Sequence, residues 1–285
     1  MQLSQLGELG LLAELERRRL IVGVEHDAAS LRDGVVVTQD VLVENVHFRL
    51  DWISWRDLGW RAAAVNLSDL AASGAEPEAL LVSLAVPGSA ELGDVLELYE
   101  GLAETGVPVV GGDTSDARGL VVGVTAVGRT ERVPGRGGAM PGDALVVTGR
   151  LGAAGAAFRQ ERYVRPPLRL VEGRELGRVA HAMLDVSDGL AVDAAHLARR
   201  SGVRCVIELE RVPLADGATV DDLGFGEDYE LLAAIRHTSD AVAHGYTCTT
   251  IGHIEAGEGV ELLLHGEPYE LTGWEHFGPG RRVKP

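Results

Sequence analysis

The stretch RVPGRGGAMPGD, residues 132–143, divides this sequence of 285 residues into two parts. Glycine and proline, which interrupt helices and strands, make up half of the stretch. On both sides of it, strand-like and helix-like segments alternate. We therefore predict an α/β protein of the α+β type with two domains, at 1–134 and 135–285.

The first part contains valine-rich runs and an alanine-rich segment. GVVVTQDVLVENVHF predicts a strand with an interruption near Gln39 and Asp40. The alanine-rich segment DLGWRAAAVNLSDLAASGAEP, 57–77, predicts a helix that ends at the Gly-Ala-Glu-Pro run. We expect a further helix at 89–105 and strands at 79–87, 107–112 and 119–130.

The second part begins again with a strand that leads into a helix, at 143–152. AMLDVSDGLAVDAAHLARRSG, 182–202, predicts the end of a strand, an acidic turn and a helix closed by Gly202. Further strands are expected at 203–212, 227–235 and 259–271. These elements predict a second α/β domain of similar size.

Composition excludes several classes of protein. The formal net charge of −17 disfavours sequence-independent binding to nucleic acid. No apolar run is long enough for a membrane span, and the first 20 residues lack a small-residue cleavage site. The two cysteines are too few for a disulfide framework, so we expect a cytoplasmic protein without membrane partners.

The only lysine is Lys284. A phosphate-binding loop of the G-x-x-x-x-G-K-[ST] type and a kinase-type strand lysine are therefore both excluded. If the protein handles nucleoside phosphates, metal ions and arginine must neutralise their charge.

Aspartates recur where hydrophobic runs end, which is where side chains of separate elements can converge. Several carboxylates gathered from distant segments could bind two or more Mg²⁺ ions, and phosphoryl transfer needs little more than such positioning and neutralisation. The residues concerned are Asp27, Asp40, Asp69, Asp113, Asp185 and Asp188.

Each of these aspartates also has a simpler interpretation. Asp188 could cap a helix, Asp113 could form an Asx-turn, and Asp69 could be an exposed helix residue. Adjacent Gly111 and Gly112 favour a functional Asp113, since they let backbone N–H groups approach a phosphate. For GEDYELL, 226–232, a solvated strand edge is the simpler interpretation.

Taken together, these stretches resemble the thiamine-monophosphate kinase family, within the aminoimidazole-ribonucleotide-synthetase-like superfamily. The resemblance rests on AVNLSDLAASGAEP, VVGGDTS, LDVSDGLAVDAAHL and GEDYELL, in that order, and on DVLVENVHF, RYVRPPLR and GEPYELTGWEHF. It implies ATP-dependent phosphorylation of thiamine monophosphate to thiamine diphosphate by direct in-line transfer. It also implies several Mg²⁺ ions and a homodimer formed by the amino-terminal domains, with a sandwich-like carboxy-terminal domain completing the site.

The resemblance also implies roles for single residues, and no general base among them. The metal ligands would be Asp27, Thr38, Asp40, Asp69, Asp113, Asp185 and Asp188. ATP would contact Tyr99, Gly112, Asp113, Arg136 and Ser187, and the substrate would contact His47, Glu227 and Trp274. Trp274 could stack on the thiazolium or the pyrimidine, while Glu227 offers an acceptor to the aminopyrimidine.

Two motifs depart from the family pattern. Glu25-His26-Asp27 replaces Gly-Asp-Asp, and Thr38-Gln39-Asp40 replaces Ser-Thr-Asp. Adjacent residues of an extended segment point to opposite faces, so the triplet at 25–27 cannot easily serve one ion. We expect Asp27 to be the ligand, and activity to be retained with altered metal affinity or geometry.

Two other functions compete with this one. Another ATP-dependent synthetase of the superfamily is disfavoured because a selenophosphate-type enzyme would need an amino-terminal cysteine and lysine, which are absent there. A non-catalytic nucleotide- or thiamine-phosphate-binding homologue would bind both ligands without transferring phosphate.

Overall fold

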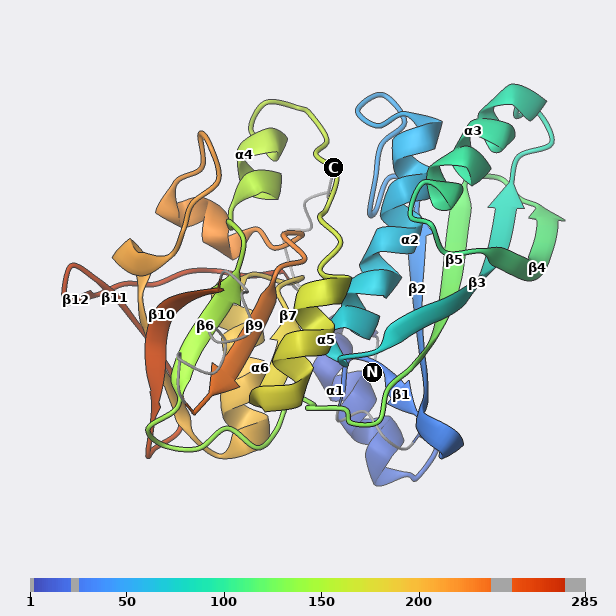
Figure 1. Ribbon diagram of the computed structural model, residues 1–285. Coiled ribbons are helices and arrows are strands. Elements are labelled where there is room, and N and C mark those ends of the chain that lie inside the picture. The colour runs from blue at the N-terminus through green and yellow to red at the C-terminus, as the bar shows by residue number, and fades with distance from the viewer. Residues whose placement is uncertain (1–2, 22–25, 237–247, 275–285) are drawn as a thin grey trace.

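The computed structural model describes residues 3–21, 26–236 and 248–274, and Lys284 lies outside these ranges. Two separate β-sheets lie side by side in this part of the chain, with helices between and around them (Figure 1). The helices are α1 (Leu3–Arg17), α2 (Trp55–Ala72), α3 (Leu92–Ala103), α4 (Ala153–Phe158), α5 (Leu170–Val179) and α6 (Leu190–Ser201). None of the helices in the described ranges is long and apolar enough to cross a membrane.

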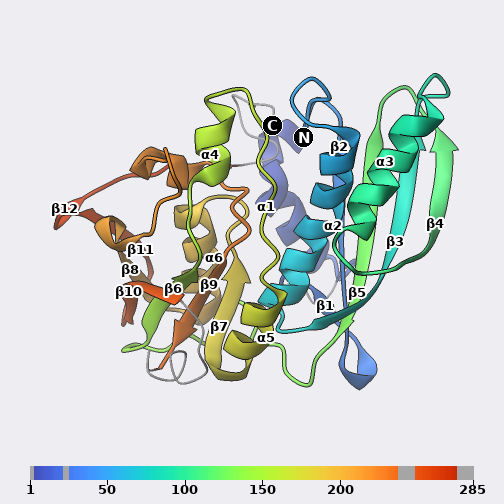
Figure 2. The same cartoon turned by 45° about the horizontal axis from the view of Figure 1, so that its top comes forward.

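The first sheet has the strand order β1-β2-β5-β3-β4. Strand β5 pairs antiparallel with both β2 and β3, while β3 and β4 run parallel. Residues from α2 and α3 pack on one face of this sheet (Figure 2). The strands are β1 (Ala29–Ser30), β2 (Val35–Val43), β3 (Glu76–Val86), β4 (Val109–Asp116) and β5 (Val121–Arg129).

The second sheet has the order β12-β11-β8-β10-β6-β9-β7. Residues of α6 form the core on one face, and α5 with the end of α2 covers the other. This arrangement confirms the predicted mixed α/β class. The strands are β6 (Ala144–Thr148), β7 (Ala180–Asp185), β8 (Arg204–Glu208), β9 (Leu231–Ile235), β10 (Cys248–Glu255), β11 (Gly259–Leu264) and β12 (Glu267–Pro268).

Helix α2 packs against both sheets. Leu58, Leu67 and Leu70 belong to the core of the first sheet, whereas Ala71 and Ala72 belong to the core that α5 shares with the second. Most of its residues are buried, which its alanine-rich sequence permits because small side chains let neighbouring backbones approach. The helix therefore joins the two halves of the molecule.

Glycines set the distance between α2 and its neighbours. A Cβ atom added to Gly59 would lie 1.9 Å from the carbonyl oxygen of Leu98, and one on Gly101 would lie 1.9 Å from that of Arg56. The two helices thus contact each other backbone to backbone, with one glycine on each side.

Three details differ from the sequence prediction. Strand β2 continues through Gln39 and Asp40, because paired hydrogen bonds to β5 run along its whole length. Asp113 lies within β4 rather than after a strand. Strand β9 begins at Leu231, so the acidic residues at 227–230 precede it.

We predict that Gly101→Ala destabilises the protein. The added methyl group must displace the α2 backbone, and overpacking of this kind costs about 1–3 kcal/mol. The matched control is Gly93→Ala on the same helix, where a Cβ atom meets nothing within 4 Å. Thermal unfolding should show a lowered Tm for Gly101→Ala, and equal Tm values for both variants would contradict the prediction.

Candidate active site between the two sheets

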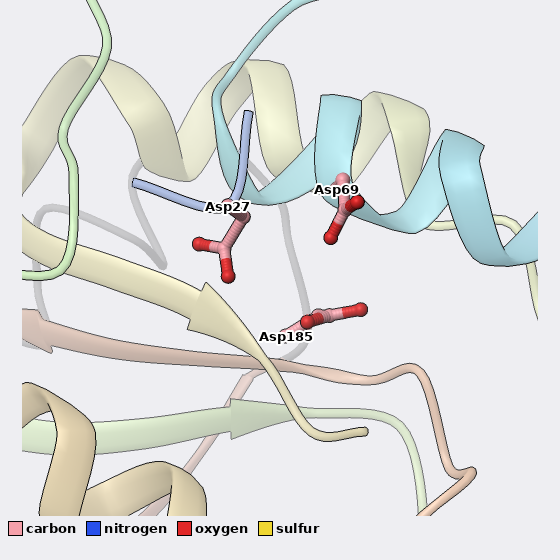
Figure 3. A group of neighbouring side chains, drawn as sticks. All are labelled: Asp27, Asp69 and Asp185. Atoms are coloured by element: carbon pink, nitrogen blue, oxygen red, sulfur yellow. The ribbon is translucent and has the colours of Figure 1, made fainter. Parts of the chain in front are cut away.

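Three aspartates from distant segments meet between the two sheets (Figure 3). Asp69 comes from α2, Asp185 ends β7, and Asp27 precedes β1. One carboxylate oxygen of each lies within 4.8 Å of the others. The structure therefore brings together three of the predicted metal ligands.

Each carboxylate of this cluster has a hydrogen-bond donor. Arg136 donates to Asp27 through Nε at 3.0 Å and Nη2 at 2.6 Å. Thr38 Oγ1 donates to Asp69 at 2.5 Å, and Ser68 Oγ donates to Asp185 at 2.5 Å. Such bonds fix the direction in which the remaining carboxylate oxygens point.

Burial and mutual repulsion make the carboxylates here hard to ionise. Desolvation, with the nearby charges of Glu227, Asp188 and Asp27, raises the pKa of Asp40 to about 6. Desolvation and Asp27 raise the pKa of Asp185 to about 7. The pKa of Asp69 is raised well above its ordinary value by burial and by Asp40 and Asp185. Asp40 and Asp188 therefore add negative charge to the surroundings of the cluster.

The donor set fits a hard divalent cation. Carboxylate and hydroxyl oxygens are the ligands that Mg²⁺ prefers, and opposite ligands of one ion lie about 4 Å apart. The 4.8 Å spread of the three aspartates requires only a small inward movement. A cation would also remove the repulsion that raises the pKa values.

The acidic turn after β7 is held by a buried residue further along the chain. Asp193 accepts hydrogen bonds from the backbone N–H groups of Ser187 and Asp188, at 3.1 and 3.0 Å. The N-cap of α6 is Gly189, so the helix-cap interpretation of Asp188 was wrong. The N–H of Trp274 donates to the carbonyl of Asp188 at 3.0 Å, which places Trp274 next to this turn.

An ion pair joins the two halves near the acidic cluster. Arg61 of α2, with 1% of its side chain exposed, donates to Glu227, which is 10% exposed. The N–H of Glu227 donates to the carbonyl of Ser187 at 2.9 Å. Glu227 therefore lies between the acidic turn and the buried guanidinium.

The other acidic residues of GEDYELL are not solvated. Both carboxylate oxygens of Asp228 accept from the N–H of Gly152, at 2.9 Å each. Glu230 accepts from Arg169 at 2.6 Å through two nitrogens. The interpretation of this stretch as a solvated strand edge was wrong, because both carboxylates are buried with their own donors.

Four predicted site residues lie on other elements. Gly112 and Asp113 are exposed on the edge strand β4, which β3 and β5 separate from β2. Tyr99 of α3 packs, partly buried, against the core of the first sheet. His47 follows β2, and its Nδ1 accepts from the N–H of Val43 at 3.0 Å, so its Nε2 carries the proton when the ring is neutral.

Among the positions that depart from the family pattern, Thr38 donates to Asp69, whereas Gln39 and His26 lie outside the three-aspartate cluster. Gln39 is exposed, on the face of β2 opposite Thr38 and Asp40. The imidazole of His26 lies against Gly135, where an added Cβ atom would be 2.4 Å from Nδ1. Glu25 lies outside the described residues.

Sequence reasoning missed four residues that support the site. They are Arg61, Asn66, Ser68 and Asp193. Asn66 accepts the N–H of Asp40 at 3.0 Å, and Ser68 binds Asp185. Two signals were available in the sequence. Arg61 interrupts an alanine-rich helix, and Asn66 lies three residues before Asp69, on the same side of that helix. For Asp193 the sequence offered only its place in the first turn of a helix.

We predict that the metal-free protein loses stability as the pH rises from about 4 to about 7. Asp40 and Asp185 are protonated in the folded protein over part of this range, whereas the unfolded chain ionises near its ordinary pKa of 3.8. The folded state therefore binds more protons than the unfolded chain. The stability that this binding contributes is lost as the pH rises through the raised pKa values.

Thermal unfolding with a chelator should show a Tm several degrees lower at pH 8 than at pH 5, since about 1 kcal/mol shifts Tm by about 2–4 °C. Asp185→Asn should flatten this dependence. Exposed Asp216→Asn is the matched control and should leave it unchanged. A Tm that rises with pH for the metal-free protein would contradict the assignment.

Comparison with known proteins identifies the family. Residues 25–130 match the AIR synthase related protein, N-terminal domain, and residues 140–265 match the AIR synthase related protein, C-terminal domain. The thiamine-monophosphate kinase of Aquifex aeolicus (strain VF5) is 33% identical in an alignment that covers 97% of this chain and 100% of that protein. That of Escherichia coli (strain K12) is 33% identical, covering 95% of this chain and 98% of its own.

Solved structures support the same family. AaThiL complexed with AMPPCP and TMP has a TM-score of 0.87 at 34% identity, over 97% of this chain and 99% of that one. The hydrogenase maturation protein HypE of E. coli, at 22% identity and a TM-score of 0.70, shares the fold. The identity and coverage confirm the resemblance, and the chain belongs to the thiamine-monophosphate kinase family.

Proposed function

We propose that this protein transfers a phosphoryl group from ATP to thiamine monophosphate and so produces thiamine diphosphate. The observation that carries the proposal is the group of carboxylates from α2, β7 and the segment before β1, in a chain that is similar to such kinases over 97% of its length. The related structure with AMPPCP and TMP supports the two substrates.

We further propose direct in-line transfer assisted by Mg²⁺. The metal ligands are Asp27, Thr38, Asp40, Asp69, Asp113, Asp185 and Asp188, and the ions neutralise the phosphates and the charge that develops during transfer. The attacking phosphate oxygen of the substrate is already ionised, so the transfer needs no general base.

The remaining residues bind and orient the two substrates in this proposal. Tyr99, Gly112, Asp113, Arg136 and Ser187 contact ATP, while His47, Glu227 and Trp274 contact thiamine monophosphate. The ion pair of Arg136 with Asp27 supports a role for this guanidinium beside the phosphates of ATP. The Nδ1 of His47 accepts from Val43, and in this proposal its Nε2–H donates to the phosphate of the substrate.

We also propose that the domains divide at 134/135 and that the amino-terminal domain forms a homodimer. Strands β2, β3 and β4 of the first sheet carry the apolar residues Val41, Leu81 and Val110, which are 50%, 39% and 62% exposed. An apolar sheet face of this kind favours contact with a second copy. Gly112 and Asp113 lie on β4, the edge strand that also carries Val110. Their proposed contacts with ATP and Mg²⁺ would therefore form at the dimer interface.

Activity provides the first test. The purified protein with ATP, Mg²⁺ and thiamine monophosphate should form thiamine diphosphate, detected by mass spectrometry. Asp69→Asn should lower kcat at least about a hundredfold, because it removes a carboxylate from the ion site. Exposed Asp216→Asn is the matched control. Binding of both substrates without turnover by the unaltered protein would instead indicate a non-catalytic homologue.

The oligomeric state provides the second test. Leu81→Glu should convert a dimer into a monomer in light scattering, because it places a charge at the centre of the apolar sheet face. Leu92→Glu changes an equally apolar residue, 73% exposed on α3, and should leave the dimer intact. A monomeric unaltered protein would contradict the proposed interface.

A further inference from the structure

The 159–169 segment connects α4 to α5 by passing over the first half of the molecule. The indole N–H of Trp60 on α2 donates to the carbonyl of Pro166 at 3.0 Å. Arg165 donates to Asp57 at 2.5 Å and also to Glu104, at the ends of α2 and α3. These contacts fix the segment against α2.

A pocket lies between this segment, α2 and the 226–230 stretch. Arg61, Tyr163 and Glu227 are among its lining residues. It therefore includes Glu227, which the proposed function assigns to the substrate, together with groups that have no assigned role.

Tyr163 lines this pocket and carries a hydroxyl group that makes no hydrogen bond with the described residues. This hydroxyl is also shielded from solvent. The guanidinium of Arg61 lies 5.8 Å from the centre of its ring. A buried hydroxyl without a partner costs free energy, and a ligand that supplies one recovers it. Burial also raises the pKa of Tyr163, so the phenol keeps its proton at neutral pH.

Glu227 and Tyr163 offer complementary groups. An ionised carboxylate only accepts hydrogen bonds, whereas a phenol can donate one. The buried guanidinium of Arg61 donates to the carboxylate of Glu227 and holds it at this side of the pocket. The edge of a 4-aminopyrimidine presents an amine donor next to a ring-nitrogen acceptor, which is the pattern that such a pair would recognise.

We propose that Tyr163 is a specificity-determining residue, whose hydroxyl donates to the ring nitrogen beside the amino group of the substrate's aminopyrimidine while Glu227 accepts from that amine. The inference rests on the proposed function. Arg61 acts as a positioning residue that holds the Glu227 carboxylate in place.

The test combines Tyr163→Phe with a substrate analogue whose ring nitrogen beside the amino-bearing carbon is replaced by C–H. With thiamine monophosphate, Tyr163→Phe should raise KM about tenfold or more and leave kcat within about twofold, since the lost bond lies far from the transferred phosphate. With the analogue, the unaltered protein should show the same increase in KM, and Tyr163→Phe should add nothing to it.

Tyr269→Phe is the matched control, because it removes a tyrosine hydroxyl that donates to Asp221 at 2.6 Å outside the pocket. It should leave KM unchanged for both substrates. If the unaltered protein is active and has the same KM for the analogue as for thiamine monophosphate, the inference is overturned but the proposed function is not. An unaltered KM in folded Tyr163→Phe overturns it too, and absence of any kinase activity overturns both.

Discussion

The close packing of α2 between the two sheets is the constraint on which the rest of the structure depends. Its small residues let α3 approach on one side and α5 on the other, with backbone contacts at Gly59, Gly101 and Gly173. Because the helix is buried, its polar side chains must find partners within the protein. Asn66, Ser68 and Asp69 find them on β2 and β7, and Arg61 finds Glu227. The packing of one helix therefore assembles the candidate site.

The electrostatics of the site follow from that burial. Carboxylates held together away from water repel one another, and the packed helix and strands prevent them from separating. The protein places a guanidinium at each end of the acidic region, Arg136 beside Asp27 and Arg61 beside Glu227. In a chain with a single lysine, arginine provides these counter-charges. The guanidinium suits the task because it stays protonated even when buried and can donate several hydrogen bonds.

Much of the fold could be predicted from the sequence. The alanine-rich helix and the valine-rich strands were visible as local patterns, and the motif order indicated the family. Local patterns gave the wrong secondary structure or the wrong burial where contacts with distant parts of the chain decided these properties. Gln39 and Asp40 suggested an interruption, yet pairing with β5 keeps β2 continuous. Asp228 and Glu230 suggested a solvated edge, yet a backbone N–H and Arg169 hold them in the interior.

The sequence by itself determined which residue types were present for the chemistry. It contained aspartates at the ends of hydrophobic runs, arginine in place of lysine, and a motif set specific to one family. Only the tertiary structure decided which of these residues meet. Asp27, Asp69 and Asp185 are far apart along the chain and come together through the packing of α2 against both sheets. Asp113, in an equally suggestive motif, lies instead on the exposed edge strand β4. Sequence patterns report local periodicity, whereas a site between two sheets is built from contacts that no local pattern records.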